Sequence, residues 1–167
     1  MATTCRLIAK NVLGSDAASV EFTSIPATYD DLLCVVSARL SVNDVWDYLK
    51  IQPNSASTNF TYRILYTHGS VASSVAYSDW IYMWAPAATA TSSTFGITSI
   101  YIPNYSGSTN KSMSIEVATE NNSTTSLIAA GAGLWSSTSA ISSLLFTPAS
   151  GNVLSGSSFY LYGITKA

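Results

Sequence analysis

The chain has 167 residues, of which 10% are charged, against about 25% in an ordinary soluble domain. Nine acidic and seven basic residues leave a net charge of −2, and the basic residues are too few and too scattered for a phosphate-binding surface, so we expect no nucleic acid as a partner. Hydrophobic residues form 47% of the chain, which excludes a disordered polymer and is enough for a packed core.

Serine and threonine, with 29 and 18 copies, make up the polar part of the composition that charged residues usually provide. Threonine favours strands, and hydroxyl groups suit the solvent-facing side of a β-sheet. A surface with few ions also suits permanent contact with neighbouring molecules, because little charge has to be desolvated at the interface. The composition therefore predicts an assembled structural protein rather than an enzyme.

The dominant period of the sequence is two residues. Over residues 31–41, Cys34 and Val36 point to one side, while Asp31 and Arg39 lie among the residues of the other side. Such alternation is typical of half-buried strands, and clusters of Gly, Pro, Asn and Ser separate the runs as turns. We predict eleven strands, at residues 5–13, 18–24, 31–41, 45–52, 60–67, 79–84, 94–102, 111–119, 125–135, 140–147 and 157–164.

This series, without a long helical pattern, predicts an all-β fold. We expect an antiparallel two-sheet sandwich, jelly-roll-like, in a single domain over residues 1–167, with residues 1–10 as an N-terminal arm or edge strand. The segment 43–47 also has the polar cap of a helix, but the alternation that follows it favours a strand. The small residues of 86–93 predict a loop.

Few side chains have the chemistry of a catalytic or metal site. His68 is the only histidine and precedes a glycine in a turn, where a solvated side chain is more usual than a catalytic base. Cys5 and Cys34 match no metal or redox motif, and a disulfide between them requires that their strands lie side by side. Asp30 and Asp31 could join loop carbonyls around calcium, but they are more simply a turn before a strand. We predict no catalytic residue, cofactor or metal.

The aromatic residues are the best functional candidates. Trp80, Tyr82 and Trp84 project from one side of a predicted strand, and Trp46 and Tyr48 form a second group. Rows of this kind can belong to an ordinary sandwich core, form the dry centre of a subunit interface, or stack on the sugar rings of a glycan. All three interpretations remain open from the sequence, with the core as the plainest.

Several phrases, spread in order over nearly the whole chain, resemble a group of small structural proteins of tailed bacteriophages. The phrases are Leu7-Ile8-Ala9, Leu13-Gly14-Ser15-Asp16-Ala17-Ala18-Ser19-Val20, Ile25-Pro26-Ala27-Thr28-Tyr29-Asp30-Asp31-Leu32, Asp47-Tyr48-Leu49-Lys50-Ile51-Gln52, Tyr62-Arg63-Ile64-Leu65-Tyr66, Ile102-Pro103-Asn104-Tyr105, Thr109-Asn110-Lys111-Ser112 and Gly156-Ser157-Ser158-Phe159-Tyr160-Leu161-Tyr162-Gly163-Ile164. Proteins of this group are jelly-roll head-decoration, fibre or tail-tip modules without a catalytic motif.

The resemblance implies a structural component of a virion. We expect a capsid decoration or cement protein that forms a homo-oligomer, with a trimer as the leading expectation, and that binds other virion proteins, above all the major capsid protein. The alternative is a tail-tip or tail-fibre module that binds host-surface glycan. No signal peptide and no membrane-spanning run occur in the sequence, so we expect synthesis in the host cytoplasm, a final location in the virion, and no membrane partner.

Overall fold

The computed structural model describes residues 4–122 and 126–166, so residues 1–3 of the predicted arm and residue 125 of a predicted strand lie outside the described residues. The described residues form twelve strands and include no helix. The strands are β1 (Cys5–Val12), β2 (Val20–Phe22), β3 (Asp31–Ala38), β4 (Trp46–Pro53), β5 (Phe60–His68), β6 (Val71–Tyr77), β7 (Ile81–Pro86), β8 (Gly96–Pro103), β9 (Lys111–Thr119), β10 (Leu127–Trp135), β11 (Leu144–Pro148) and β12 (Ser158–Ile164).

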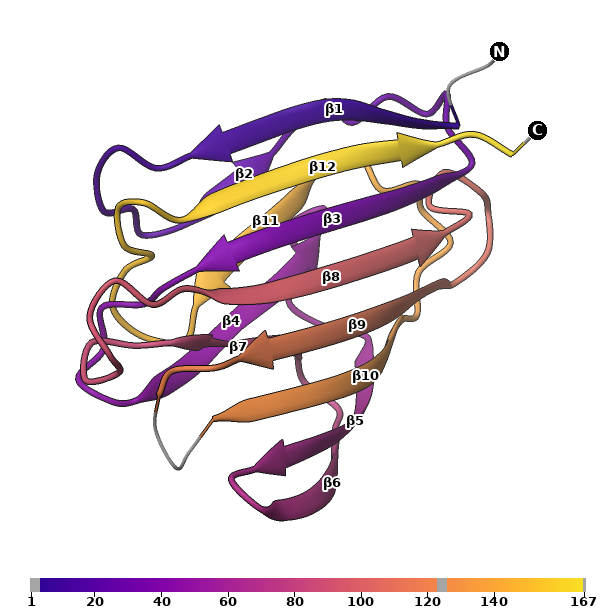
Figure 1. Ribbon diagram of the computed structural model, residues 1–167. Coiled ribbons are helices and arrows are strands. Elements are labelled where there is room, and N and C mark those ends of the chain that lie inside the picture. Colours follow the sequence, from indigo (N-terminus) through magenta and orange to yellow (C-terminus); the bar gives the residue numbers. More distant parts are fainter. Residues whose placement is uncertain (1–3, 123–125, 167) are drawn as a thin grey trace.

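The strands form two antiparallel sheets that pack as a sandwich, which confirms the predicted fold class (Figure 1). The large sheet has eight strands in the order β1-β12-β3-β8-β9-β10-β5-β6. The small sheet has four strands in the order β2-β11-β4-β7. The expected edge strand near the N-terminus is β1, which lies at one border of the large sheet.

Eight of the strands are connected as in a jelly roll. The pairs β1–β12, β2–β11, β3–β8 and β4–β7 alternate between the large and the small sheet as the chain winds around the core. The remaining strands come from two insertions, β5 and β6 between β4 and β7, and β9 and β10 between β8 and β11. Because β10 pairs with β5, the two insertions together extend the large sheet beyond β8.

The core lies between the sheets and follows the two-residue period of the sequence. On β3, Leu32, Cys34 and Val36 are at most 1% exposed, whereas Leu33 and Val35 face away from the core. The nine residues of β9 alternate strictly between buried and exposed. A slip of one residue would turn these apolar sides outward, so burial sets the register of the strands.

The strand β6 is the one element that the sequence pattern misses. Its run from Val71 to Tyr77 has small residues on both faces of the strand, so the two faces do not differ in polarity and no apolar–polar alternation indicates a strand. Several strands begin two residues later than predicted, among them β2 at Val20, β7 at Ile81 and β8 at Gly96, and β11 begins four residues later, at Leu144. The segment after 43 leads into strand β4, and the residues that follow β7 form a loop, as predicted.

Candidate functional site

The predicted aromatic row lies on the side of the small sheet that faces away from the sandwich core. Tyr48 of β4 is directly opposite Trp84 of β7, and Lys50 is opposite Tyr82. The ring centroid of Tyr48 is 5.4 Å from that of Trp84, 5.1 Å from that of Tyr82 and 5.6 Å from that of Trp46. The structure thus brings Trp46, Tyr48, Tyr82 and Trp84 together in one contact group.

The β5–β6 hairpin folds over this group and covers it from the far side. Tyr66 of β5 lies 5.4 Å from Trp84, and Tyr77 of β6 lies 5.3 Å from Tyr82, between ring centroids. The extension of the large sheet therefore curls around β7, the edge strand of the small sheet, and leaves Trp84 only 2% exposed. The rings of the aromatic cluster are those of Trp46, Tyr48, Tyr66, Tyr77, Tyr82 and Trp84.

Trp80 stands apart from the aromatic cluster. It precedes β7, and its ring stacks on that of Phe60 with the centroids 6.4 Å apart. The Nζ atom of Lys50 lies 4.3 Å from the centroid of the Trp80 ring. A cation over an indole face contributes roughly 0.5–1 kcal/mol at an exposed site. Trp80 therefore joins the start of β5 to the small sheet.

Burial determines the chemistry of the tyrosines in the cluster. Burial raises the pKa of Tyr48 to about 12, and it likewise raises the pKa of Tyr82 to about 12. Both phenols are therefore protonated at neutral pH. Trp46, Tyr48 and Tyr82 are only partly buried, so one border of the cluster is open to a ligand or a neighbouring molecule.

His68 borders the aromatic cluster at the end of β5. Its ring centroid lies 5.7 Å from that of Trp46, and the Trp46 indole N–H donates a long hydrogen bond of 3.4 Å to His68 Nε2. Within residues 4–122 and 126–166, no group of three or more His, Cys, Asp and Glu side chains is placed to hold a metal ion.

The two cysteines are free thiols that lie on different strands. Cys5 is on β1 and exposed, and Cys34 is on β3 and buried. Since β12 lies between these strands, the two residues cannot form a disulfide. Burial raises the pKa of the Cys34 thiol, which makes it unreactive.

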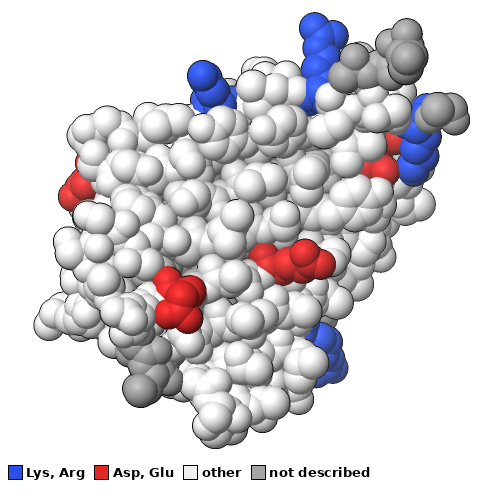
Figure 2. All heavy atoms as spheres, in the orientation of Figure 1, with Lys and Arg blue, Asp and Glu red and all other residues white. Residues whose placement is uncertain are grey.

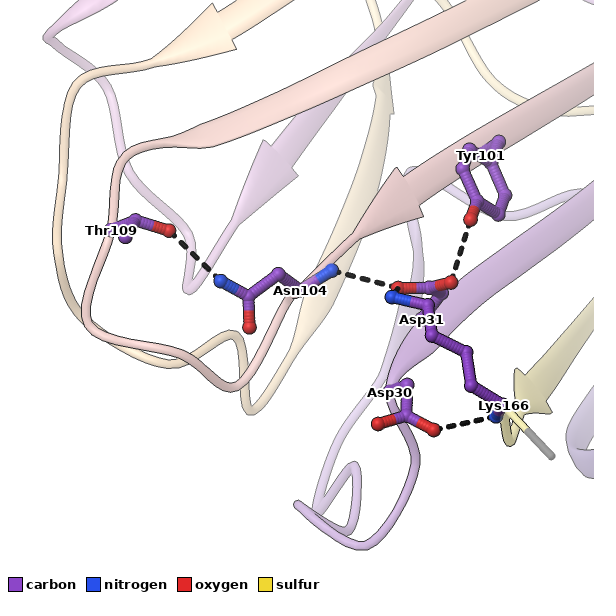
Figure 3. A network of polar contacts seen from close by, with 6 residues as sticks. All are labelled: Asp30, Asp31, Tyr101, Asn104, Thr109 and Lys166. Carbon is purple, nitrogen blue, oxygen red and sulfur yellow. Dashed lines mark hydrogen bonds and ion pairs between the residues drawn. The ribbon is translucent and has the colours of Figure 1, made fainter.

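The acidic pair Asp30 and Asp31, at the start of β3, ties the C-terminal segment to the large sheet (Figure 3). Asp31 Oδ2 accepts a hydrogen bond of 2.6 Å from the Tyr101 hydroxyl, and Asp31 Oδ1 accepts one of 2.9 Å from the backbone N–H of Asn104. Lys166 Nζ lies 3.2 Å from Asp31 Oδ1, and the backbone N–H of Lys166 donates to Asp30 Oδ2 at 2.6 Å. Burial alone would raise the pKa of Asp31, but these hydrogen bonds and the nearby ammonium group hold it below its usual value. Both carboxylates thus have structural partners.

Arg39 is a buried cation that the two-residue pattern placed among the polar residues of a strand. It lies just after β3, is 7% exposed, and its guanidinium donates to the carbonyl oxygens of four residues of the loop that follows β7. The bonds go to Thr91 at 2.7 Å, Thr94 and Ala90 at 2.9 Å, and Ala88 at 3.3 Å. The sequence has no signal for this contact, because the partners are backbone groups.

Lys111 is a second buried cation with backbone partners. It begins β9, is 0% exposed, and its Nζ donates to the carbonyl oxygens of Gly107 (2.6 Å) and Thr109. Burial lowers the pKa of this ammonium group. Like Arg39, it organises a loop from inside the protein.

The outer face of the large sheet, which is the face turned away from the small sheet, is broad and nearly uncharged. Figure 2 views the molecule from this side and shows isolated charged groups on a neutral surface. Leu65, Ile97 and Ile128 are 61%, 55% and 67% exposed. Ile97 is paired with Ala118, which is paired with Ile128, so these side chains share one row across β8, β9 and β10.

Small residues between these side chains leave an apolar depression in the outer face. The depression has a volume of about 610 Å³ and is lined by residues of β5, β6, β8, β9 and β10, among them Leu65, Ala72, Ile97 and Ile128, with Glu116 as the one charged residue of the lining. Isolated exposed apolar residues are normal, whereas their grouping around this depression makes it a candidate interaction surface. Sequence reasoning missed it, because each of these residues occupies the solvent-facing side of its own strand.

Comparison of the sequence with protein-family models and with curated proteins finds no match. None of the described residues belongs to a helix long and apolar enough to cross a membrane.

Proposed function

We propose that the protein is a non-enzymatic structural component of a bacteriophage virion, a capsid decoration or cement protein that stabilises the shell as a homo-oligomer. The observation that carries the proposal is the outer face of the large sheet, with its exposed Leu65, Ile97 and Ile128 around an apolar depression. The proposed location in a virion is based on the resemblance of the sequence to structural proteins of tailed phages.

The energetics of this face suit permanent attachment. Eight strands at a spacing of about 4.8 Å and strands of about eight residues at about 3.3 Å per residue give a face of roughly 38 by 26 Å, or about 1,000 Å². A stable protein interface buries about 800 Å² per partner. The face is therefore large enough for one such contact, and apart from Glu116 at the depression few charged groups would have to be desolvated.

The test is a copy count in purified virions together with binding of the isolated protein to particles that lack it. We expect many copies on the head, and we expect Leu65→Asp and Ile128→Asp to weaken particle binding at least tenfold without unfolding the protein, since both side chains are exposed. Thr23→Asp, at an exposed position after β2 of the small sheet and away from the outer face, is the matched control and should bind normally. Absence of the protein from the virion would refute the proposal.

A second candidate function is glycan binding by a tail-tip or fibre module. The observation that favours it is the open border of the aromatic cluster, where the partly buried rings of Trp46, Tyr48 and Tyr82 lie near His68. Aromatic faces beside polar groups stack on sugar rings. Binding to a glycan array that Trp46→Ala abolishes and Trp46→Phe retains, with a few copies on the tail, would support this function over the first.

A further inference from the structure

The two sheets have four open edges, and three of them carry features that prevent pairing with another strand. The edge strand β2 is only three residues long. The edge strand β7 ends in Pro86, and a Cβ atom on Gly96 of β8 would lie 2.7 Å from the proline ring, so this edge is closely covered. The edge strand β1 has a shift of register between Leu7 and Ala9 and carries Arg6 and Lys10. Short length, coverage, bulges and basic residues are the usual protections of sheet edges.

The fourth edge, β6, has none of these protections. It is seven residues long, contains no charged residue and no proline, and pairs with β5 in an unbroken register. Figure 1 shows β6 at the border of the large sheet, with no described strand beyond it. Val71, at the start of the strand, is 62% exposed.

The turn between β5 and β6 decides which backbone groups of β6 point away from the sheet. His68 and Val71 flank a two-residue turn that begins with Gly69 at φ 58°, as the tight turns of β-hairpins require. Such a turn makes the flanking pair a hydrogen-bonded pair, and hydrogen-bonded pairs alternate with non-bonded pairs along an antiparallel ladder. Ala72, Ser74 and Ala76 are the non-bonded residues, so their N–H and C=O groups are free to bind another strand.

We propose that a second copy of this chain pairs with β6, antiparallel and across a two-fold axis at Ser74, so that two large sheets become one continuous sheet. Ser74 is the middle residue of β6. The strand then meets its own image, with Ala72 opposite Ala76 of the second copy and Ser74 opposite Ser74 of the second copy. A two-fold interface must be self-complementary in this way.

The side chains match in this register. On the face toward the aromatic cluster, the exposed Val71 lies opposite Tyr77 of the second copy, a β-branched and aromatic pair of the kind that stabilises sheets. On the outer face the side chains are Ala, Ser and Ala, which read the same in both directions and allow close approach. A charged peptide would find no complementary group on β6, which favours a second copy over an unrelated partner.

The pairing also doubles the outer face. Because the two-fold axis runs perpendicular to the joined sheet, both apolar depressions lie on the same side of the dimer. The use of this doubled face for attachment to a shell rests on the proposed function, whereas the pairing itself does not. A two-fold contact gives a dimer in solution, so measured mass separates it from the trimer that the sequence led us to expect.

The test uses charge at the two-fold axis. We expect the purified protein to be a dimer by sedimentation, and Ser74→Lys and Ser74→Glu each to weaken the dimer at least tenfold, since the two new side chains would lie opposite their own copies. An equal mixture of the two variants should restore a dimer that contains one chain of each. Ser112→Lys and Ser112→Glu, also exposed but on β9, are matched controls and should remain dimeric.

A disulfide checks the register. In a Cys5→Ser background, Ser74→Cys should form a covalent dimer under oxidation, because hydrogen-bonded antiparallel pairs place Cα atoms about 5.5 Å apart, within the range of a disulfide. Ser112→Cys should not. A monomer, a trimer in which Ser74→Cys forms no cross-link, or a dimer that survives both charge variants would overturn the inference, even if particle binding is normal. A cross-linked dimer that does not bind virus particles would instead refute the proposed function alone.

Discussion

Replacing Arg39 tests whether a buried cation with backbone partners holds the loop after β7. In Arg39→Met the apolar part of the side chain is kept and the guanidinium is lost, together with its bonds to Ala90, Thr91, Thr94 and Ala88. The backbone contacts of residue 39 itself are unchanged, since its N–H donates to Ser157 Oγ. The variant therefore isolates the guanidinium.

The expected loss follows from the exposure of the acceptors. Ala90 is buried, and a buried acceptor without a partner costs about 1–3 kcal/mol. Thr91 is exposed, so its carbonyl can regain water and its bond is worth about 1 kcal/mol, as is the bond to Thr94. The bond to Ala88, at 3.3 Å, adds little. Methionine loses about as much rotamer freedom on burial as arginine, so side-chain entropy offsets little of this loss. We expect a net loss of about 4 kcal/mol in the free energy of unfolding.

Urea unfolding of Arg39→Met and of the matched Arg63→Met measures this loss. Arg63 is exposed on β5, so its replacement should change the free energy of unfolding by no more than about 0.5 kcal/mol. Hydrogen exchange of the backbone amides of Ala88 and Thr89, which donate to Val42 and Asp44, should accelerate only in the Arg39 variant. A loss below about 1 kcal/mol with unchanged exchange would refute the assignment of Arg39 as the organiser of the loop.

Two further predictions concern pH. The folded-state pKa of Asp31 is lowered, so its contribution to stability is present above the unfolded pKa, near 3.9, and is lost as pH falls through the folded pKa. Asp31→Asn should therefore flatten the acid limb of a curve of unfolding free energy against pH. An unchanged limb would contradict the network of Figure 3. Burial raises the pKa of Tyr48 from 10.0 to about 12, so between these values the unfolded chain releases more protons and stability falls as pH rises. Tyr48→Phe should reduce that fall in alkaline urea titrations, and an unchanged fall would contradict the burial of the Tyr48 phenol.

The candidate surfaces were accessible to sequence reasoning to different degrees. Trp46, Tyr48, Tyr82 and Trp84 form one group because each occupies the same side of β4 or β7, a relation that the two-residue period predicts within each strand. The burial of Trp84 at 2% exposure depends on the β5–β6 hairpin, and β6 has no polar contrast in its sequence. Which of these aromatic rings are covered could therefore not be read from their own strands.

The charged residues of the interior illustrate the same limit. Asp31 and Arg39 share the side of the 31–41 alternation that normally faces water, yet they are 1% and 7% exposed. Asp31 is buried because Tyr101 and Lys166 reach it from distant segments, and Arg39 because a loop from beyond β7 wraps around it. Neither set of partners is close in sequence, and the partners of Arg39 are backbone carbonyls.

The amino-acid sequence by itself determined the class of the fold and the position of most strands, because alternation of apolar and polar side chains is a local property that each strand carries alone. Only the tertiary structure decided how the two insertions join into one extension, which aromatic rings they cover, and where the unprotected edge β6 and the apolar depression lie. These features arise from pairing between segments that are far apart in the chain, and the free energy of such contacts depends on burial that no single segment specifies.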